Sequence, residues 1–242
     1  MEGIALNSAG WANNILPLVF MMHKKTYSHM KKFLLPAALF ALAACGDASK
    51  SAGEAGDVAA GTGTSYAIDA AASSLTWEGA KMSETVHSGT IKLSEGTLSV
   101  KDDRIEAGSF TIDMNSITDT DLTDTTYANK LVGHLKSADF FQTDSFPTAR
   151  FEITGVTPSA SPDSVVIAGN LTLKGVTNGI SFPARVAVAD STVDASARIT
   201  INRNDWGVTW GGSKTDKSIM DMLKNNLIKD EITLIVSLKA KK

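Results

Sequence analysis

The chain has 242 residues, of which 43% are hydrophobic and 20% charged, an ordinary composition for a globular protein. Residues 1–45 contain four of the 23 basic and one of the 26 acidic residues, so the remainder has 19 basic and 25 acidic residues and a net charge of −6. This balance argues against nucleic-acid binding, which requires a basic stripe, and against a polybasic membrane-binding surface.

The first predicted element is an export signal over residues 1–44. Lys31 and Lys32 precede an apolar run over 33–44. A run of about 12 residues is too short to cross a bilayer, which needs about 20. The simplest account of residues 1–29 is that translation starts at Met30.

Cys45, the one cysteine of the chain, follows Leu42-Ala43-Ala44 at the end of this run. The tetrapeptide resembles a lipobox, in which the cysteine receives a diacylglycerol and the chain is cleaved before it. Additional acyl chains make such an anchor stable. A single cysteine also excludes an intramolecular disulfide and a Cys-based metal site.

Residues 45–64 are expected to form a lipidated, disordered tether. Gly46 to Thr64 are nearly all small or charged, and Val58 is the one branched aliphatic side chain. Such a segment cannot bury a core and would reach about 25 Å as a flexible coil.

From Ser65 to Lys242 the dominant hydrophobic period is two, which is typical of strands with one buried face. Clear examples are 165–173, 180–188 and 232–238, and turns are predicted at 94–96, 101–103, 174–175 and 189–191. About eight to ten strands without a βαβ rhythm indicate an all-β antiparallel barrel or sandwich.

Two short helices interrupt this pattern and are expected across the mouth or side of the sheet. The first covers 127–136, after the candidate cap residues Asp124 and Thr125, and the second covers 218–226.

Several ordered motifs resemble the YceI family. They are His87-Ser-Gly89, Gly108-Ser-Phe110-Thr-Ile112-Asp113, the block from Leu131 to Phe141 with His134, Ser137 and Asp139, Phe146-Pro147, Gly169-Asn-Leu171-Thr-Leu173-Lys-Gly175-Val-Thr177, and Asn202-Arg203-Asn-Asp205-Trp206-Gly207. The resemblance implies an extended, eight-stranded, lipocalin-like antiparallel β-barrel with two short helices near its mouth. It also implies that a polyisoprenoid chain binds inside.

Candidate ligand-binding residues follow from the inward strand faces and the family motifs. They are Trp77, His87, Phe110, Ile112, Leu131, His134, Leu135, Phe140, Phe151, Leu171 and Leu173. Two interpretations of His134 stay open: a half-buried side chain that bonds a backbone carbonyl, or a donor to a lipid head. The same choice applies to His87.

The groups that hydrolysis or metal binding would need are not arranged in recognisable motifs. There is no Gly-x-Ser-x-Gly, and only His87 and His134 follow the signal, too few for a zinc site. Asp119, Asp121 and Asp124 resemble half of a calcium loop and are interpreted as a solvated loop. We therefore expect no enzyme activity, no metal and no cofactor.

The leading hypothesis is non-enzymatic binding of an isoprenoid-type lipid (a polyprenol, polyprenyl phosphate or quinone) in an apolar barrel interior. The alternative is a structural envelope lipoprotein with a filled barrel, and an unfilled interior would favour binding. The expected partners are the lipid and, through Cys45, the outer membrane on its periplasmic side; a homodimer stays open.

Overall fold

The computed structural model describes residues 51–161, 163–223 and 227–242. Its elements, in chain order, are β1 Thr64–Ile68, β2 Ser74–Lys81, β3 Val86–Lys101, β4 Arg104–Asp113, η1 Met114–Ser116, α1 Thr125–Lys136, β5 Thr148–Pro158, β6 Ser164–Leu173, β7 Val176–Val188, β8 Thr192–Asn202, η2 Arg203–Trp206, α2 Lys217–Leu223 and β9 Ile228–Lys241. The predicted export signal 1–44, Cys45 and residues 46–50 lie outside the described residues.

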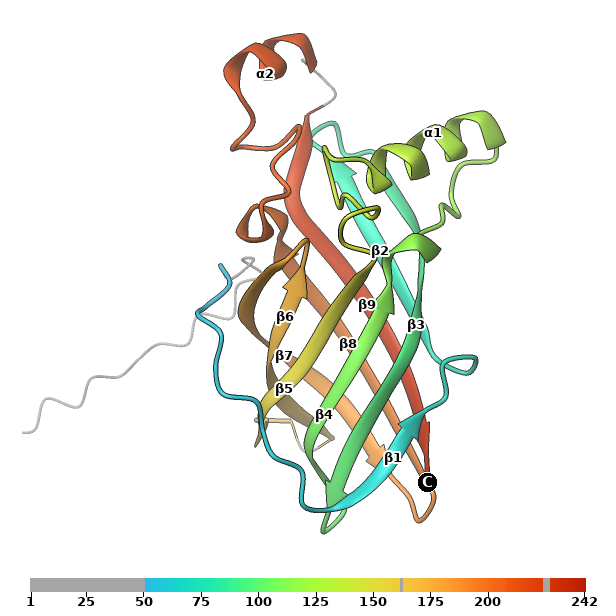
Figure 1. The fold of residues 1–242 in the computed structure, drawn as a ribbon, viewed down its shortest axis with the longest axis vertical. Helices are drawn as coiled ribbons and strands as arrows, with labels where there is room; N and C mark the ends of the chain where they lie inside the picture. Colours follow the sequence, from blue (N-terminus) through green and yellow to red (C-terminus); the bar gives the residue numbers. More distant parts are fainter. Residues whose placement is uncertain (1–50, 162, 224–226) are drawn as a thin grey trace, which may run out of the picture. The chain divides into compact units, whose positions relative to one another are not determined.

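The strands form a closed antiparallel barrel, as the sequence predicts (Figure 1). Each of β2 to β9 pairs with its neighbours, and β3 pairs with β4 to close the ring. β1 and β2 share one of the eight positions, because both lie between β3 and β9 at opposite ends. Closure removes the free edges that an open sheet would expose.

The alternation of the strands explains which side chains fill the barrel. In β9, Leu238 and Ala240 are buried, whereas Lys239 and Lys241 between and after them are exposed. Adjacent strands match this pattern, so Ala240 pairs with the fully buried Val193 of β8. Period-two patterning therefore directs one apolar face of every strand inward.

One predicted turn is wrong. Ser94, Glu95 and Gly96 lie inside the sixteen-residue strand β3, where the pairing with β4 shifts register between Leu93 and Glu95. A β-carbon at Gly96 would lie 2.8 Å from the Phe110 ring, so glycine permits close packing there. The triplet therefore forms a β-bulge where the chain packs closely. Glycine is common both in bulges and in turns, which is why the sequence pattern resembled a turn.

The two helices lie at the same end of the barrel, which we call the mouth (Figure 1). Asp124 caps α1 by accepting hydrogen bonds from the backbone of Thr126 and Tyr127, as expected for an N-cap aspartate. α2 begins at Lys217, one residue before the predicted 218–226, and the predicted part 224–226 lies outside the described residues. No helix within the described ranges is long and apolar enough to cross a bilayer.

Residues 51–63 differ from the expected disordered tether, and we call them the strap. The strap runs along the outer wall from η2 towards β1 (Figure 1). Its backbone bonds the side chains of Asp205, Asn170 and Glu106 in turn, and Ala59 donates to the carbonyl of Ile153. Small residues cannot form a core, but they let the backbone lie close enough to bond the barrel.

Candidate functional site

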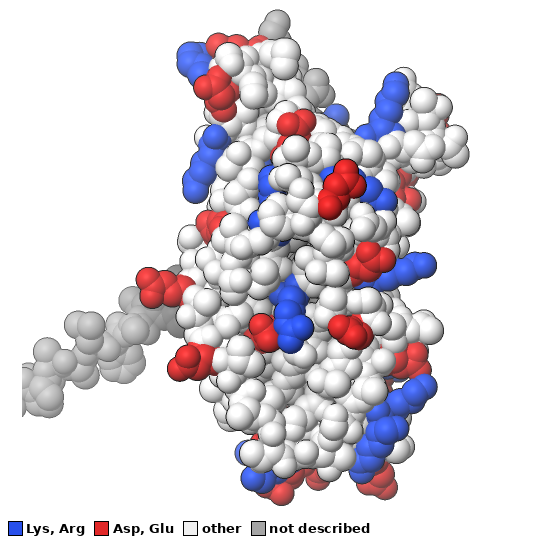
Figure 2. Space-filling model, in the orientation of Figure 1, with Lys and Arg blue, Asp and Glu red and all other residues white. Residues whose placement is uncertain are grey.

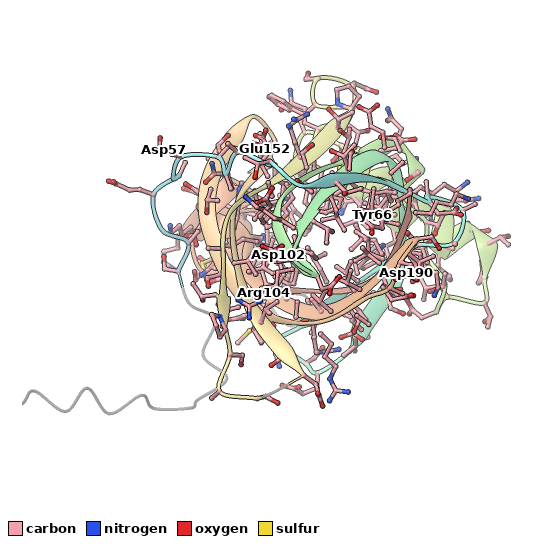
Figure 3. The ribbon with its side chains drawn as sticks, turned by 90° about the horizontal axis from the view of Figure 1, so that it is seen from below. Asp57, Tyr66, Asp102, Arg104, Glu152 and Asp190 are labelled. Atoms are coloured by element: carbon pink, nitrogen blue, oxygen red, sulfur yellow. The ribbon has the colours of Figure 1, made fainter. Side chains whose placement is uncertain are left out.

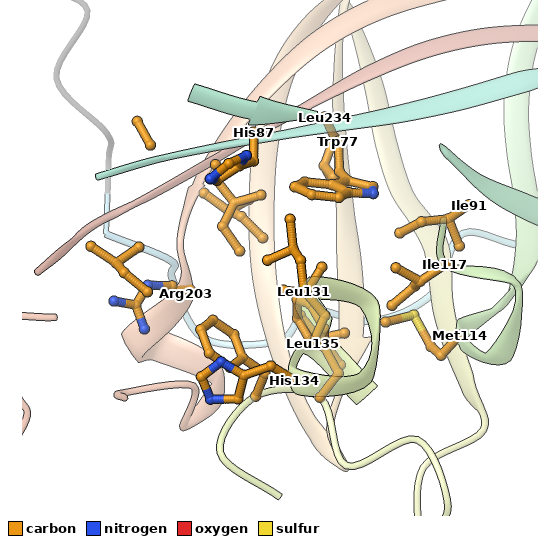
Figure 4. A pocket seen from close by; sticks show the side chains of 18 of the residues that line it. Trp77, His87, Ile91, Met114, Ile117, Leu131, His134, Leu135, Arg203 and Leu234 are labelled. Carbon is orange, nitrogen blue, oxygen red and sulfur yellow. The ribbon is translucent and has the colours of Figure 1, made fainter. Parts of the chain in front are cut away.

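The main cavity of the barrel has a volume of about 510 Å³ and lies at the mouth end (Figure 4). This volume is within the range of small-molecule sites, about 300–1,000 Å³. Nine of the candidate residues line it: Trp77, His87, Ile112, Leu131, His134, Leu135, Phe140, Leu171 and Leu173. The interior is thus unfilled where the sequence motifs converge.

A second cavity of about 100 Å³ continues the first along the barrel. The remaining candidates, Phe110 and Phe151, line it; they are paired across β4 and β5 and their rings stack with centroids 6.3 Å apart. The two cavities share four wall residues: Leu75, Ile112, Leu171 and Leu234. They can therefore serve as two parts of one elongated apolar site.

The end opposite the mouth, which we call the floor, is closed by packing. Tyr66 is 3% exposed, and its hydroxyl lies 3.5 Å from the carbonyl of Ala189 and 3.4 Å from that of Asp190 in the β7–β8 turn (Figure 3). Leu98 and Val193 are also buried there. A ligand would accordingly enter and leave at the mouth.

Charged and histidine side chains are confined to the mouth end of the combined cavity. The charged and histidine residues that line the larger cavity are Lys81, His87, His134, Arg203, Lys229 and Glu231. The smaller cavity has Ser196 as its one polar lining residue. This gradient suits an amphiphile whose head stays at the mouth while its tail enters the barrel.

His87, at the start of β3, is held by the segment that leads to α1. Its Nδ1 lies 3.0 Å from Oδ2 of Asp121, whose Oδ1 accepts a hydrogen bond from the Ser88 backbone. Nearby, the Trp77 indole donates to the carbonyl of Thr118 at 3.0 Å. A β-carbon at Gly89 would lie 1.8 Å from that carbonyl oxygen, so only glycine lets the segment lie so close to β3.

Two opposing effects act on the pKa of the Asp121 carboxyl. Burial alone would raise its pKa, but the hydrogen bonds from the Ser88 backbone and from His87 outweigh burial and lower the pKa below its usual value. Because an ionised carboxylate only accepts hydrogen bonds, Nδ1 of His87 carries a proton in this pair. Nε2 is then the nitrogen left for a ligand.

His134 lies on α1 and contacts a carboxylate rather than the backbone carbonyl that one interpretation assumed. Its Nε2 is 3.1 Å from Oδ2 of Asp139, just after the helix. The imidazole also packs edge-on against Phe140 and Trp210, with ring centroids 4.9 and 4.4 Å away. It therefore joins α1 to the loop after η2 and lines the cavity at the same time.

Arg203 is a functional candidate that sequence reasoning did not single out, although it lies in a family motif. It is 1% exposed and lines the larger cavity. Its Nη1 donates to the carbonyls of Val208 and Trp210, and its Nε to that of Lys229. Burial lowers its pKa, although nearby Asp230 acts in the opposite sense. Its Nη2 has no hydrogen-bond partner within the described ranges.

A further cluster joins His87 with Asp119 and Asp121, whose ligand atoms all lie within 4.8 Å of one another. The sequence interpretation placed these aspartates in a loop but did not bring His87 to them. Oδ1 of Asp119 accepts from the Leu122 backbone. Three such atoms could contact a cation, and their internal bonds also explain the loop without one.

The described surface is mixed in charge. On the face shown in Figure 2, acidic and basic side chains are interspersed, without a continuous basic stripe. Pairs such as Arg198 with Glu78, 2.7 Å apart, bring opposite charges together across strands.

Fold and cavity define a class: a closed, lipocalin-like antiparallel β-barrel with a hollow apolar interior. Residues 66–240 match the YceI-like domain, and the chain belongs to the YceI family.

Relatives and solved structures agree with this assignment. UPF0312 protein SAS2572 of Staphylococcus aureus is 37% identical over 94 residues, 36% of this chain and 52% of that protein. A UPF0312 protein of Pseudomonas aeruginosa is 42% identical over 76 residues, covering 31% of this chain and 35% of the relative. The chain thus spans about half the length, or less, of these curated relatives.

Two solved structures share the fold. Burkholderia cenocepacia BcnA has a TM-score of 0.56 at 21% identity, covering 72% of this chain and 99% of that one. A polyisoprenoid-binding domain from Saccharophagus degradans, described as implicated in plant cell wall breakdown, has a TM-score of 0.55 at 17% identity. The coverage there is 73% of this chain and 97% of the neighbour.

Proposed function

We propose that this protein binds an isoprenoid-type lipid, with the tail in the barrel and the head at the mouth, and performs no catalysis. The observation that carries the proposal is the elongated apolar cavity whose ionisable groups lie at one end. Burial of apolar surface, at about 25 cal/mol per Å², supplies the binding energy without any reaction. The polyisoprenoid-binding domain that shares this fold supports the choice of ligand class.

The groups at the mouth favour a head with an acceptor oxygen, such as a phosphate or a carbonyl. Nη2 of Arg203 makes no hydrogen bond within the described ranges, although it lies 3.8 Å from Oδ1 of Asp230, and Lys229 also lines the cavity. A charge-assisted bond to a buried guanidinium would fix the head, since such bonds are stronger than neutral ones. His87 and His134 are the further candidates for head contacts.

The filled-barrel alternative is less well supported. A scaffold barrel would have interdigitated side chains throughout, whereas here such packing is complete at the floor and an open volume of about 510 Å³ lies at the mouth. A protein that served only as a scaffold would not need this unfilled apolar cavity.

A titration tests the proposal. Trp77 and Trp210 line the cavity, so their fluorescence reports occupancy by a polyprenol, a polyprenyl phosphate or a quinone. We expect micromolar or tighter binding, and Arg203→Met should weaken the phosphate more than the polyprenol. The proposal fails if none of the three ligands binds the wild-type protein. Equal weakening of all ligands in Arg203→Met would contradict the head assignment.

We further propose that Cys45 is lipidated and that the protein resides in the cell envelope, at the outer membrane facing the periplasm. The support is the Leu42-Ala43-Ala44-Cys45 motif after a short apolar run. Cys45→Ser should yield uncleaved precursor or soluble protein. Membrane fractionation combined with N-terminal mass analysis tests this, and a fully membrane-bound variant that still begins at residue 45 would overturn it.

A further inference from the structure

Exposed apolar side chains gather around the mouth. Among the described residues, the large hydrophobic side chains that are more than one third exposed are Val58, Met82, Val86, Tyr127, Val176 and Met222. All but Val58 lie at the mouth: in the β2–β3 turn, at the starts of β3 and β7, and on α1 and α2. Met222 is 73% and Tyr127 61% exposed. Clusters of this kind mark interaction sites on soluble proteins.

The strap brings the N-terminal chain to the same end. The Ala52 backbone donates to Asp205 of η2 at 2.8 Å, and Gly53 exchanges two backbone hydrogen bonds with Gly179 near the start of β7. Five residues lie between Cys45 and Ser51, and the seven steps from Cys45 to Ala52 span at most about 25 Å when the chain is fully extended.

The chain between Ala52 and Cys45 is too short to extend from this attachment to the floor of the barrel. β8 runs eleven residues from its floor end at Thr192 to Asn202, just before η2. At about 3.3 Å per residue the strand extends for roughly 35 Å. A membrane anchor at Cys45 can therefore bring the mouth, and not the floor, to the bilayer while the strap stays bound.

We propose that the mouth docks on a lipid bilayer surface, so that a lipid passes between the membrane and the barrel without crossing water. The inference rests on the proposed lipid-binding function and on acylation of Cys45. The exposed apolar side chains at the mouth, all of those named above except Val58, enter the interface, and the cavity opens at the same end. Lys217 is paired with Asp221 and Lys229 with Glu84, so cationic attraction is partly neutralised and apolar insertion carries the contact.

The first experiment separates surface contact from the anchor and from cavity binding. The chain from residue 45 onward, with Cys45→Ser so that it lacks both the apolar run 33–44 and the acyl anchor, is floated with phosphatidylcholine vesicles and with vesicles that include phosphatidylglycerol. The triple variant Met82→Ser, Tyr127→Ser and Met222→Ser should lower partitioning about tenfold in both, and Val58→Ser, on the strap, should leave it unchanged. Retained lipid is measured separately by extraction and mass spectrometry, so loss of cavity binding is distinguishable from loss of docking.

Three flotation results would overturn the docking proposal: no binding of the wild-type surface to either vesicle, unchanged binding of the triple variant, or equal loss with Val58→Ser. A mouth that instead serves a protein partner would give the first or second of these.

The second experiment measures orientation in the acylated protein. Acylation blocks the Cys45 sulfur, so Met222→Cys or Asp190→Cys provides a unique site for a fluorophore at the mouth or at the floor. A quencher attached to lipid headgroups should quench the label at 222 at least severalfold more than the label at 190. Equal quenching, or stronger quenching at 190, would contradict the proposal.

Discussion

The imidazole of His134 and the indole of Trp210 lie edge to face, with ring centroids 4.4 Å apart and planes at 85°. This contact joins α1 to the loop after η2, two segments that both line the mouth of the cavity. Such pairs contribute about 0.5–1.5 kcal/mol beyond their buried area.

Trp210→Ala should loosen the mouth and speed release of bound lipid several-fold, because α1 loses this support. Stopped-flow transfer of a fluorescent polyprenol to vesicles measures the rate. Trp210→Phe keeps an aromatic ring and is the matched control, expected to stay within about twofold of wild type. Identical release from all three proteins would show that the contact does not control access.

Ala149 and Ala240 are both 2% exposed, but only Ala149 lines the large cavity, whereas Ala240 packs at the floor. Ala149→Phe should therefore cost less than about 1 kcal/mol in the lipid-free protein, while reducing lipid capacity. Ala240→Phe should cost about 1–3 kcal/mol, as overpacking does in a filled core. Urea unfolding gives both free energies, and equal destabilisation would indicate a filled barrel.

The strap depends on the absence of a side chain at Gly179, where a β-carbon would lie 2.4 Å from the carbonyl oxygen of Glu54. Gly179→Ala should release the start of the strap and raise the amide exchange of Gly53 at least tenfold. Gly155→Ala is the control, since a β-carbon there meets nothing within 4 Å. Protection that is unchanged in Gly179→Ala would show that the strap is not held there.

The lowered pKa of Asp121 predicts that this residue stabilises the fold at neutral pH and less so in acid. Its pKa is lowered from 3.8 in the folded protein, so ionised Asp121 stabilises the fold above about pH 4, and this contribution is lost as pH falls through the folded pKa. The melting temperature of Asp121→Asn should be lower than that of wild type at pH 6, and the difference should shrink towards pH 3. A difference that is constant with pH would contradict this assignment.

The barrel was predictable because period-two patterning repeats in every strand, and the α1 cap because Asp124 immediately precedes the helical spacing. The strap was not predictable, because it has too few apolar side chains to form a core, and its hydrogen bonds to the barrel use backbone groups that leave no pattern in the sequence. Asn170, which binds Gly56 through both amide atoms, is 114 residues away from it in sequence.

The cavity walls were also predictable from inward faces and family motifs, whereas the polar mouth was only partly so. His87 and Asp121 are 34 residues apart, and nothing in their local sequence pairs them. Arg203 was missed because a buried arginine depends on carbonyls supplied by other segments, those of Val208, Trp210 and Lys229. The available signal was the place of Arg203 inside the family motif Asn202-Arg203-Asn-Asp205-Trp206-Gly207.

The central claim is that the hollow barrel holds a lipid, and native mass spectrometry of the protein purified from its own host tests it most directly. The account predicts one bound molecule per chain with the mass of an isoprenoid-type lipid, identified after organic extraction and reduced in Ala149→Phe. Protein that carries no lipid, and that binds neither a quinone nor a polyprenol in the micromolar range (about −8 kcal/mol), would contradict it.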